Sequence, residues 1–146
     1  MNTKNVLPWD ISTFPGMTSV LPLTAVVKSK DALEKMFSQP PVRDSTFPKK
    51  QLPCWSPATY PAQTRRGNAN VETVTALVYD FDHTTDAPSK ISERLKQIGV
   101  SFGIHTTWSH RPSEPRYRVI LFLSRPLLPD EYSSAWENGL RLIGYD

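Results

Sequence analysis

Two acidic residues end an otherwise apolar segment, and they are the first residues in the chain whose spacing suggests chemistry. The segment reads ALVYDFDHTT over residues 76–85 and carries Asp80 and Asp82. If it is a β-strand, these two share one face while Tyr79 and Phe81 point the other way, into the core. Buried carboxylates are costly unless they are paired, protonated or bound to a metal. Two carboxylates at this spacing can share Mg²⁺ or Mn²⁺; the alternative is a strand end that turns into solvent.

A second group of polar residues lies in the segment HTTWSHRPSEPRYR, residues 105–118. Its two prolines predict a turn over residues 110–115 between two paired strands. The hairpin would bring several candidate nucleotide-binding residues toward one sheet face, namely His105, Ser109, His110, Arg116 and Arg118. Imidazole and guanidinium donors together suit a triphosphate, since arginine can donate two hydrogen bonds to phosphate oxygens. An exposed hairpin with ordinary surface cations is the alternative. A zinc site is less well supported, because the chain has neither a CxxC nor an HExxH motif.

The third candidate region is basic and lies earlier in the chain. Between residues 40 and 70, five cations stand against one anion, and Trp55 and Tyr60 lie among them. A basic stretch with aromatic side chains suits the phosphates and stacked bases of single-stranded nucleic acid. The candidate nucleic-acid contacts are Lys49, Lys50, Arg65 and Arg66. The alternative is a solvated loop whose aromatic side chains pack on the core.

The elements that must position these residues alternate regularly in the second half of the chain. Runs of β-forming residues predict strands over 74–82, 101–108 and 116–123, and apolar stripes predict helices over 87–99 and 128–144. The order β-α-β-β-α is that of a split βαβ, ferredoxin-like unit without its last strand. A right-handed crossover makes the first two strands parallel, and the last two form a hairpin. The absent last strand indicates a fragment of a longer protein.

The first half of the chain has a different texture. Nine of the 14 prolines lie within the first 61 residues, although a strand over 23–28 and a helix over 29–39 are predicted there. We therefore expect an α+β fold in two parts. Residues 1–72 are expected to form a proline-rich α/β extension that packs on the core. Residues 73–146 are expected to form a core that resembles an RNA-recognition motif.

Composition sets broad limits on location and partners. A chain of 146 residues can bury a core without disulfides, and the single Cys54 excludes a disulfide framework. No run approaches the ~20 apolar residues of a membrane span, and the N-terminus lacks the apolar core of a signal peptide. We expect a protein of the cytoplasm, in a bacterial or phage-infected host cell, with no membrane partner. The net charge of +3 permits a nucleic-acid partner without requiring one.

Taken in order, these motifs resemble the archaeo-eukaryotic primase superfamily, in particular the primase-polymerase domains of phage and plasmid replication proteins. That superfamily has an apolar strand ending in D-x-D, a small-x-His motif on a following strand and a further acid after an apolar residue. Here D-x-D corresponds to Asp80 and Asp82, and the further acid to Asp146 in GYD. The histidine position is open between His110 in WSH and Arg118 in RYR.

The resemblance implies template-directed nucleotidyl transfer on an RNA-recognition-motif-like catalytic core. Two divalent ions, Mg²⁺ or Mn²⁺, held by Asp80, Asp82 and Asp146 would activate the primer 3′-hydroxyl and neutralise charge that develops on the phosphates. The cluster within residues 105–118 would hold the nucleoside triphosphate. The basic stretch would contact a single-stranded DNA template, and a replicative helicase is a further expected partner.

Two other functions fit parts of the sequence. YDFDHTT also matches the D-x-D-x-T motif of haloacid-dehalogenase-like phosphatases, with Asp80 as nucleophile and Asp82 as general acid and base. Such an enzyme needs a downstream lysine and an acidic pair, whereas the only lysines after Thr85 are Lys90 and Lys96 in a predicted helix. The other alternative is a non-catalytic module that binds nucleic acid, for example at a replication origin. Its strands should carry exposed aromatic residues, which RYRVILFL does not show.

Overall fold

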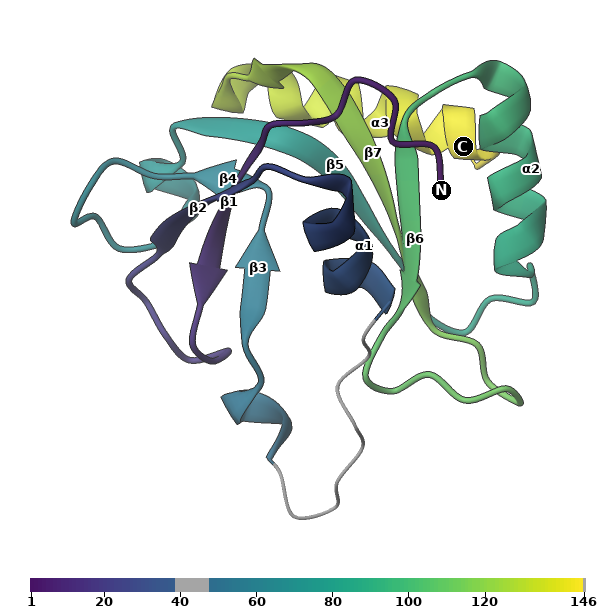
Figure 1. The fold of residues 1–146 in the computed structure, drawn as a ribbon, viewed down its shortest axis with the longest axis horizontal. Helices are drawn as coiled ribbons and strands as arrows, with labels where there is room; N and C mark the ends of the chain where they lie inside the picture. Colours follow the sequence, from purple (N-terminus) through teal and green to yellow (C-terminus); the bar gives the residue numbers. More distant parts are fainter. Residues whose placement is uncertain (39–47, 146) are drawn as a thin grey trace.

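The chain folds as a mixture of antiparallel sheets and helices, which confirms the predicted α+β class. The computed structural model describes residues 1–38 and 48–145. One sheet has the strand order β2-β1-β3 and the other has the order β4-β5-β7-β6 (Figure 1). Along the chain, the elements are β1 (Trp9–Phe14), β2 (Leu23–Val27), α1 (Lys30–Ser38), η1 (Lys49–Gln51), β3 (Cys54–Ser56), β4 (Ala58–Thr59), η2 (Asn68–Asn70), β5 (Thr73–Phe81), α2 (Pro88–Ile98), β6 (Phe102–Thr106), β7 (Tyr117–Leu127), η3 (Pro129–Glu131) and α3 (Tyr132–Ile143).

The four-stranded sheet has the connectivity predicted for the second half of the chain. β5 and β6 both pair with β7 in antiparallel fashion, so they run parallel to each other on either side of it. β6 and β7 form the predicted hairpin, and α2 connects β5 to β6. The edge beside β5 is occupied by the two-residue strand β4, which comes from the first half of the chain. Both halves of the chain therefore contribute to this sheet.

One face of this sheet is closed by α2 and α3 (Figure 1). Tyr79 and Phe81 of β5 are buried there in the same cluster as Leu95 of α2. Pro88 begins α2, at a position where its missing N–H would have had no partner in the helix. Gly99 ends the helix with a φ of 84°, a left-handed conformation that glycine adopts at little cost. The alternation along β5 thus places its aromatic residues on the helix side, as predicted.

The three-stranded sheet and α1 cover part of the opposite face. Trp9 of β1 and Leu33 of α1 are buried against Ala76 of β5 and Ile120 of β7. The Trp9 indole Nε1 donates a 3.1 Å hydrogen bond to the Thr75 hydroxyl, which fixes β1 on the sheet. This apolar cover does not extend to the end of β5, where Asp80 is exposed.

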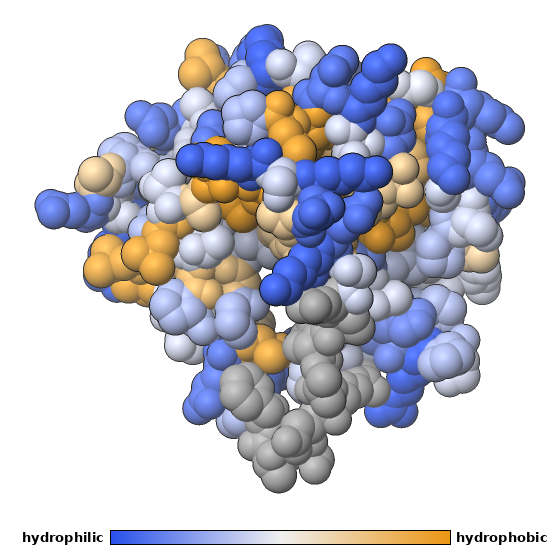
Figure 2. Space-filling model, viewed as in Figure 1, coloured by the Kyte–Doolittle hydropathy of each residue, from blue (hydrophilic) through white to orange (hydrophobic). Residues whose placement is uncertain are grey.

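The surface is mostly polar, with an apolar area at one edge. Figure 2 shows hydrophilic side chains over much of one face and apolar side chains gathered near the three-stranded sheet. The large exposed hydrophobic side chains in and just before β2 are Val20, Leu21, Leu23 and Val26. β2 is the edge strand of its sheet, so its outer backbone groups have no strand partner among the described residues. None of the helices in the described part of the chain is long and apolar enough to cross a membrane.

The sequence analysis does not predict β1, β3 or β4. β3 and β4 have three and two residues, and Pro57 separates them. Their partners lie far away in the chain; for example, Thr13 of β1 pairs with Trp55 of β3. Short strands of this kind are stabilised by packing and pairing rather than by a local pattern. β7 also runs past its predicted end at residue 123, because a bulge in the pairing lets Leu127 pair with Val74.

Candidate functional site

The pairing of β5, β7 and β6 places three predicted site residues in one row across the sheet. Asp80 pairs with Arg118, and Arg118 pairs with His105. Asp80 is exposed, in contrast to its buried neighbours Tyr79 and Phe81. The Arg118 Nε donates a 2.6 Å hydrogen bond to the Asp80 Oδ1. The strand register therefore brings an acid, a guanidinium and an imidazole together on the sheet face opposite α2 and α3.

A second row lies one step nearer the strand ends. Asp82 follows β5 and Arg116 precedes β7. The pKa of Arg116 is raised mainly by the 2.8 Å hydrogen bond that it donates to Glu114, and the attraction of Asp82 adds to this effect. The Arg116 Nε is buried and has no hydrogen-bond partner within residues 1–38 and 48–145. Glu114 thus holds one edge of this guanidinium, while Nε is unpaired in the described part of the chain.

His105 is held in one orientation by its surroundings. Its Nδ1 lies 2.8 Å from the Thr106 carbonyl oxygen, so Nδ1 carries the proton and donates. Its ring stacks on Phe37 of α1, with the centroids 5.3 Å apart and the planes 9° from parallel. Burial lowers the pKa of His105, which favours the neutral imidazole. The Nε2 is buried and has no hydrogen-bond partner among the residues that the structure describes, so it is available as an acceptor for a ligand.

A cavity of about 540 Å³ lies over both rows. A volume of this size is within the range of small-molecule sites. The wall from the second half of the chain is mostly polar and consists of Asp80, Asp82, His105, Thr106, Thr107, Trp108, Ser109, Arg116 and Arg118. The wall from the first half is mostly apolar and consists of Met17, Met36, Phe37, Lys49, Leu52, Pro53, Cys54 and Trp55. We call these the charged wall and the apolar wall.

The donor set fits a divalent cation only in combination with a ligand. Among the described residues, no group of three or more histidine, cysteine, aspartate or glutamate side chains gathers in a way that could hold a metal ion. Asp80 and Asp82 alone leave most of a coordination shell open. Mg²⁺ commonly binds in this way, through one or two carboxylates with waters and substrate phosphates. The carboxylate pair therefore fits an ion that arrives with a phosphate ligand.

Among the described candidates for nucleotide binding, His110 does not join this group. His110 does not line the cavity; its Nδ1 accepts a 3.2 Å hydrogen bond from the backbone N–H of Arg116 and so stabilises the hairpin. Ser109, by contrast, lines the cavity. The structure thus places His105 in the cavity and His110 in the hairpin, and a role of His110 in nucleotide binding stays a prediction. Asp146 lies outside the described residues.

The predicted basic contacts gather around the turn that follows β1. Lys49 lines the cavity itself, and the Lys50 carbonyl oxygen accepts a 3.0 Å hydrogen bond from the backbone N–H of Met17. The Arg66 guanidinium donates to the Met17 carbonyl oxygen and lies 5.0 Å from the centre of the Phe14 ring. The Arg65 side chain is exposed. Lys49, Lys50 and Arg66 thus lie at the rim of the apolar wall, although Arg66 is well separated from the two lysines in the sequence.

The sequence analysis missed the apolar wall as part of a site. Its residues come from the turn after β1, from α1 and from the segment leading into β3, and only tertiary packing brings them together. Trp55 was noted only as an aromatic residue in a basic stretch. A local pattern that could have placed Met17, Met36 and Leu52 opposite the acidic residues is absent from the sequence.

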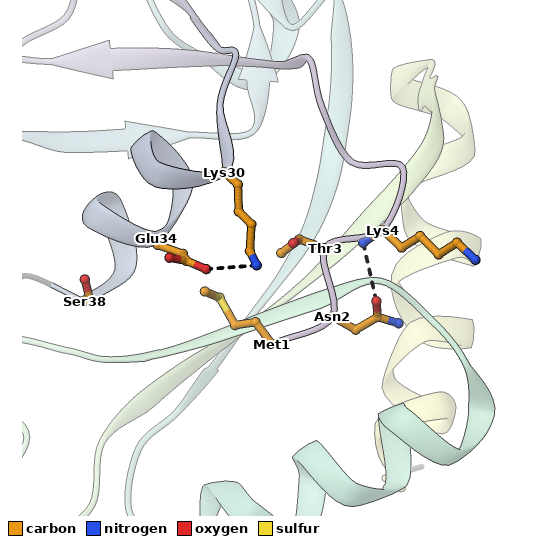
Figure 3. Close-up of a pocket in the computed structure, with 7 residues that line it drawn as sticks. All are labelled: Met1, Asn2, Thr3, Lys4, Lys30, Glu34 and Ser38. Atoms are coloured by element: carbon orange, nitrogen blue, oxygen red, sulfur yellow. Dashed lines mark hydrogen bonds and ion pairs between the residues drawn. The ribbon is translucent and has the colours of Figure 1, made fainter.

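A second and larger hollow, about 730 Å³, lies between α1 and the N-terminal segment (Figure 3). It is lined by Met1, Asn2, Thr3, Lys4, Lys30, Glu34 and Ser38. Lys30 and Glu34 lie one turn apart on α1 and form an ion pair at 3.6 Å, and both side chains are largely exposed. An exposed pair one helical turn apart is ordinary surface chemistry. The hollow contains none of the predicted site residues, so size alone does not identify the functional cavity here.

The fold and the cavity define an α+β domain whose charged wall suits a phosphate-bearing ligand. Residues 59–142, more than half of the chain, match the family model described as the VapE N-terminal domain. The chain belongs to the VapE N-terminal domain family, a family associated with phage and plasmid replication. No curated protein and no solved structure matches the chain. The matched range runs from β4 into α3, so it includes the charged wall and excludes the apolar wall.

Proposed function

We propose that this chain is a nucleotidyltransferase domain of the primase or polymerase type that acts in the replication of a phage or plasmid. The observation that carries the proposal is the convergence of two carboxylates and two guanidiniums in one cavity on neighbouring strands. Opposite charges that converge in this way suit a triphosphate bound together with a divalent cation. Membership of the VapE N-terminal domain family supports the replication context.

In this proposal Arg116 and Arg118 bind the phosphates of an incoming nucleoside triphosphate. Arg118 forms an ion pair with Asp80 in the structure. The Asp80 side chain is 56% exposed, and exposed ion pairs contribute little to stability. Exchange of this pair for contacts to a cation and a phosphate therefore costs little. His105 Nε2, the acceptor without a partner, would receive a hydrogen bond from the nucleotide.

Asp80 and Asp82 would hold Mg²⁺ or Mn²⁺ together with phosphate oxygens of the nucleotide. Bound there, the ion would neutralise charge on the α-phosphate and lower the pKa of the attacking 3′-hydroxyl. A second ion requires a third acidic ligand, for which Asp146 remains the candidate from the sequence. A single-stranded DNA template would run over the rim that carries Lys49, Lys50, Arg65 and Arg66, and a replicative helicase would be a further partner.

A second candidate function is nucleic-acid binding without catalysis. It is favoured by one observation: in residues 1–38 and 48–145 the two aspartates have no third metal-ligating side chain beside them. In that case Arg116 and Arg118 would contact the phosphate backbone of a strand rather than a triphosphate. This candidate predicts binding of single-stranded DNA that does not depend on Mn²⁺ or on the aspartates.

The phosphatase alternative has less support from the cavity. That mechanism needs a lysine beside the nucleophile, supplied from later in the chain than Asp80. Lys49 is the lysine among the described residues that line the cavity, and it precedes Asp80. We therefore do not propose phosphatase activity.

The test is calorimetry with Mn²⁺ and a nucleoside triphosphate, titrated into the wild type and into Asp80→Asn/Asp82→Asn. Asp10→Asn/Asp130→Asn is the matched control, because it removes two negative charges from exposed positions outside the cavity. We expect metal-dependent binding in the wild type and in the control, and none in the site variant. Primer extension on a single-stranded template then tests catalysis in the same three proteins.

The two candidates give different outcomes. Nucleotide binding that is lost in the site variant, together with primer extension, supports the transferase. Single-stranded DNA binding without any nucleotide binding supports the non-catalytic module. Nucleotide binding that is equal in all three proteins contradicts a role for the two aspartates.

A further inference from the structure

We infer that the apolar wall, contributed by the first half of the chain, is the binding surface for the base of the nucleotide. This inference rests on the proposed nucleotide-binding function and extends it, because it assigns the substrate class and the side of the cavity that recognises it. The charged wall would hold the phosphates, and the base would lie against Trp55, Met17 and Leu52 on the other side. The two halves of the chain would thus each bind a different part of one ligand.

The distribution of charge across the cavity supports this division. Among the described residues that line the cavity, all ionisable groups apart from Lys49 and the thiol of Cys54 belong to the charged wall. The apolar wall offers an indole, two thioethers, Leu52 and Pro53. In the described part of this wall, Lys49 is the one counter-charge for a second phosphate group, whereas the face of a base suits aromatic and apolar side chains. A ligand that fits both walls must be anionic at one end and flat and apolar at the other.

Trp55 is the residue on the apolar wall best suited to stack on a base. Its ring is held by Trp9, 5.3 Å away at an interplanar angle of 74°, and by Phe37, 6.1 Å away at 53°. These edge and tilted contacts fix the indole without stacking on its face. Phe37, in contrast, is buried and already stacked on His105. The contacts with Trp9 and Phe37 hold the Trp55 ring in place. Because Trp55 is only half-buried, its ring is still partly accessible.

Met17 and Leu52 complete the wall at its rim. Met17 is 44% exposed, and Leu52 is half-buried and belongs to neither of the two apolar core clusters. Their side chains therefore have little part in holding the fold together. The Met17 backbone N–H donates to the Lys50 carbonyl oxygen, and the Met17 carbonyl oxygen accepts from the Arg66 guanidinium, so Met17 is tied to the basic rim. The apolar wall is thus continuous with the cations proposed to contact the template.

The experiment compares ligands with and without a base. ATP, dATP and inorganic tripolyphosphate, each with Mn²⁺, are titrated calorimetrically into the wild type, Trp55→Ala and Met17→Ala/Leu52→Ala. The double variant is included because Trp55 packs on Trp9, so that Trp55→Ala can fail to fold. The matched control is Val20→Ala/Leu21→Ala, which removes two exposed apolar side chains outside the cavity.

We expect both wall variants to weaken the binding of ATP and dATP by roughly 5- to 150-fold, the range expected for loss of a base-stacking platform. Tripolyphosphate should bind all folded variants equally, and the control should behave as the wild type. If ATP and tripolyphosphate bind alike and neither wall variant changes them, the base-binding role is wrong while the phosphate site stands. If neither ligand binds the wild type, both the proposed function and this inference are wrong.

The single cysteine provides a second readout that does not depend on affinity. Cys54 lines the apolar wall and is the only cysteine in the chain, so a maleimide reports on this wall alone. Saturating ATP should slow its modification, whereas saturating tripolyphosphate should leave the rate unchanged. Equal rates with both ligands at saturation would contradict the assignment of the base to this wall.

Discussion

The two faces of the four-stranded sheet are built from the same strands, but one face forms a closed core and the other lines a cavity. On the face covered by α2 and α3, which we call the helix side, the buried residues include Tyr79 and Phe81 of β5 and Tyr117 and Val119 of β7. On the other side, the alternate residues include Asp80 and Arg118, which face a cavity. Because side chains alternate along a strand, one short stretch of sequence can serve a closed core and an open site.

The comparison teaches that stability and ligand binding are separable in this domain. Leu95 of α2 has no exposed surface, whereas the Arg118 side chain is 31% exposed and pairs with the still more exposed Asp80. Substitutions on the helix side should therefore lower the free energy of unfolding and leave the affinity of the folded protein unchanged. Substitutions on the cavity side should do the reverse. The predictions below test this separation.

The largest effect should come from the closed face. Leu95→Ala removes a fully buried side chain from the cluster between α2 and the sheet, and we expect it to cost about 2–5 kcal/mol. Urea denaturation measures the change, with the exposed Lys96→Ala as the neighbouring control. Nucleotide affinity per folded molecule should not change. A loss of affinity in folded Leu95→Ala would show that the two faces are coupled.

On the cavity face, Arg118→Gln should lower nucleotide affinity roughly 10- to 150-fold, the range for a hydrogen bond to a charged group. Its stability should change by less than about 1 kcal/mol, since the pair with Asp80 is partly exposed. Arg125→Gln is a close control: Arg125 forms a 2.7 Å ion pair with Glu131, and neither residue lines the cavity. Equal affinity losses in the two variants would point to a general charge effect instead of a binding site.

A smaller loss of stability should follow from Gly139→Ala in α3. A Cβ at this position would lie 2.1 Å from the Tyr79 Oη, which donates a 2.7 Å hydrogen bond to the Trp136 carbonyl. Overpacking of this kind costs about 1–3 kcal/mol, so the transition in urea should shift to lower concentration. Gly67→Ala serves as the control, since its Cβ would meet nothing within 4 Å. Equal stability of both variants would mean that α3 moves away from the sheet at no cost.

The same comparison shows how far the sequence could be interpreted. The elements from β5 to α3 were predicted with nearly their observed bounds, because period-two and helical patterns are written locally. The opposite orientations of Tyr79 and Asp80 followed from strand geometry alone. The contact between Arg118 and Asp80 depends in addition on strand register, which no local pattern in the sequence determined.

What could not be predicted depends on contacts between distant segments. β3 has only three residues and pairs with β1 across more than forty residues, from Ser56 to Ser12, so it shows no strong local signal. The apolar wall needs those strands and α1 to be in place before Trp55 can face the cavity. His110 was placed in the site from its position in the hairpin, whereas its Nδ1 accepts a hydrogen bond from the Arg116 backbone. Which of two nearby histidines faces a cavity is decided by turn geometry that residue types do not specify.

The smallest effect concerns pH and separates the two faces again, because His105 is a buried titratable group on the cavity side. Burial lowers its pKa below the ordinary 6.5, so between these two pKa values the unfolded chain binds a proton that the folded chain does not. The contribution of His105 to stability is therefore fully present above about pH 6.5 and is lost as the pH falls through the folded pKa.

The variant His105→Phe keeps an aromatic ring against Phe37 and removes the titration. Urea denaturation between about pH 7.5 and pH 5 should show a smaller loss of stability in this variant than in the wild type. Identical slopes would mean that His105 is solvated in the folded protein, and its Nε2 would then not be the buried acceptor on which its proposed contact with the nucleotide depends.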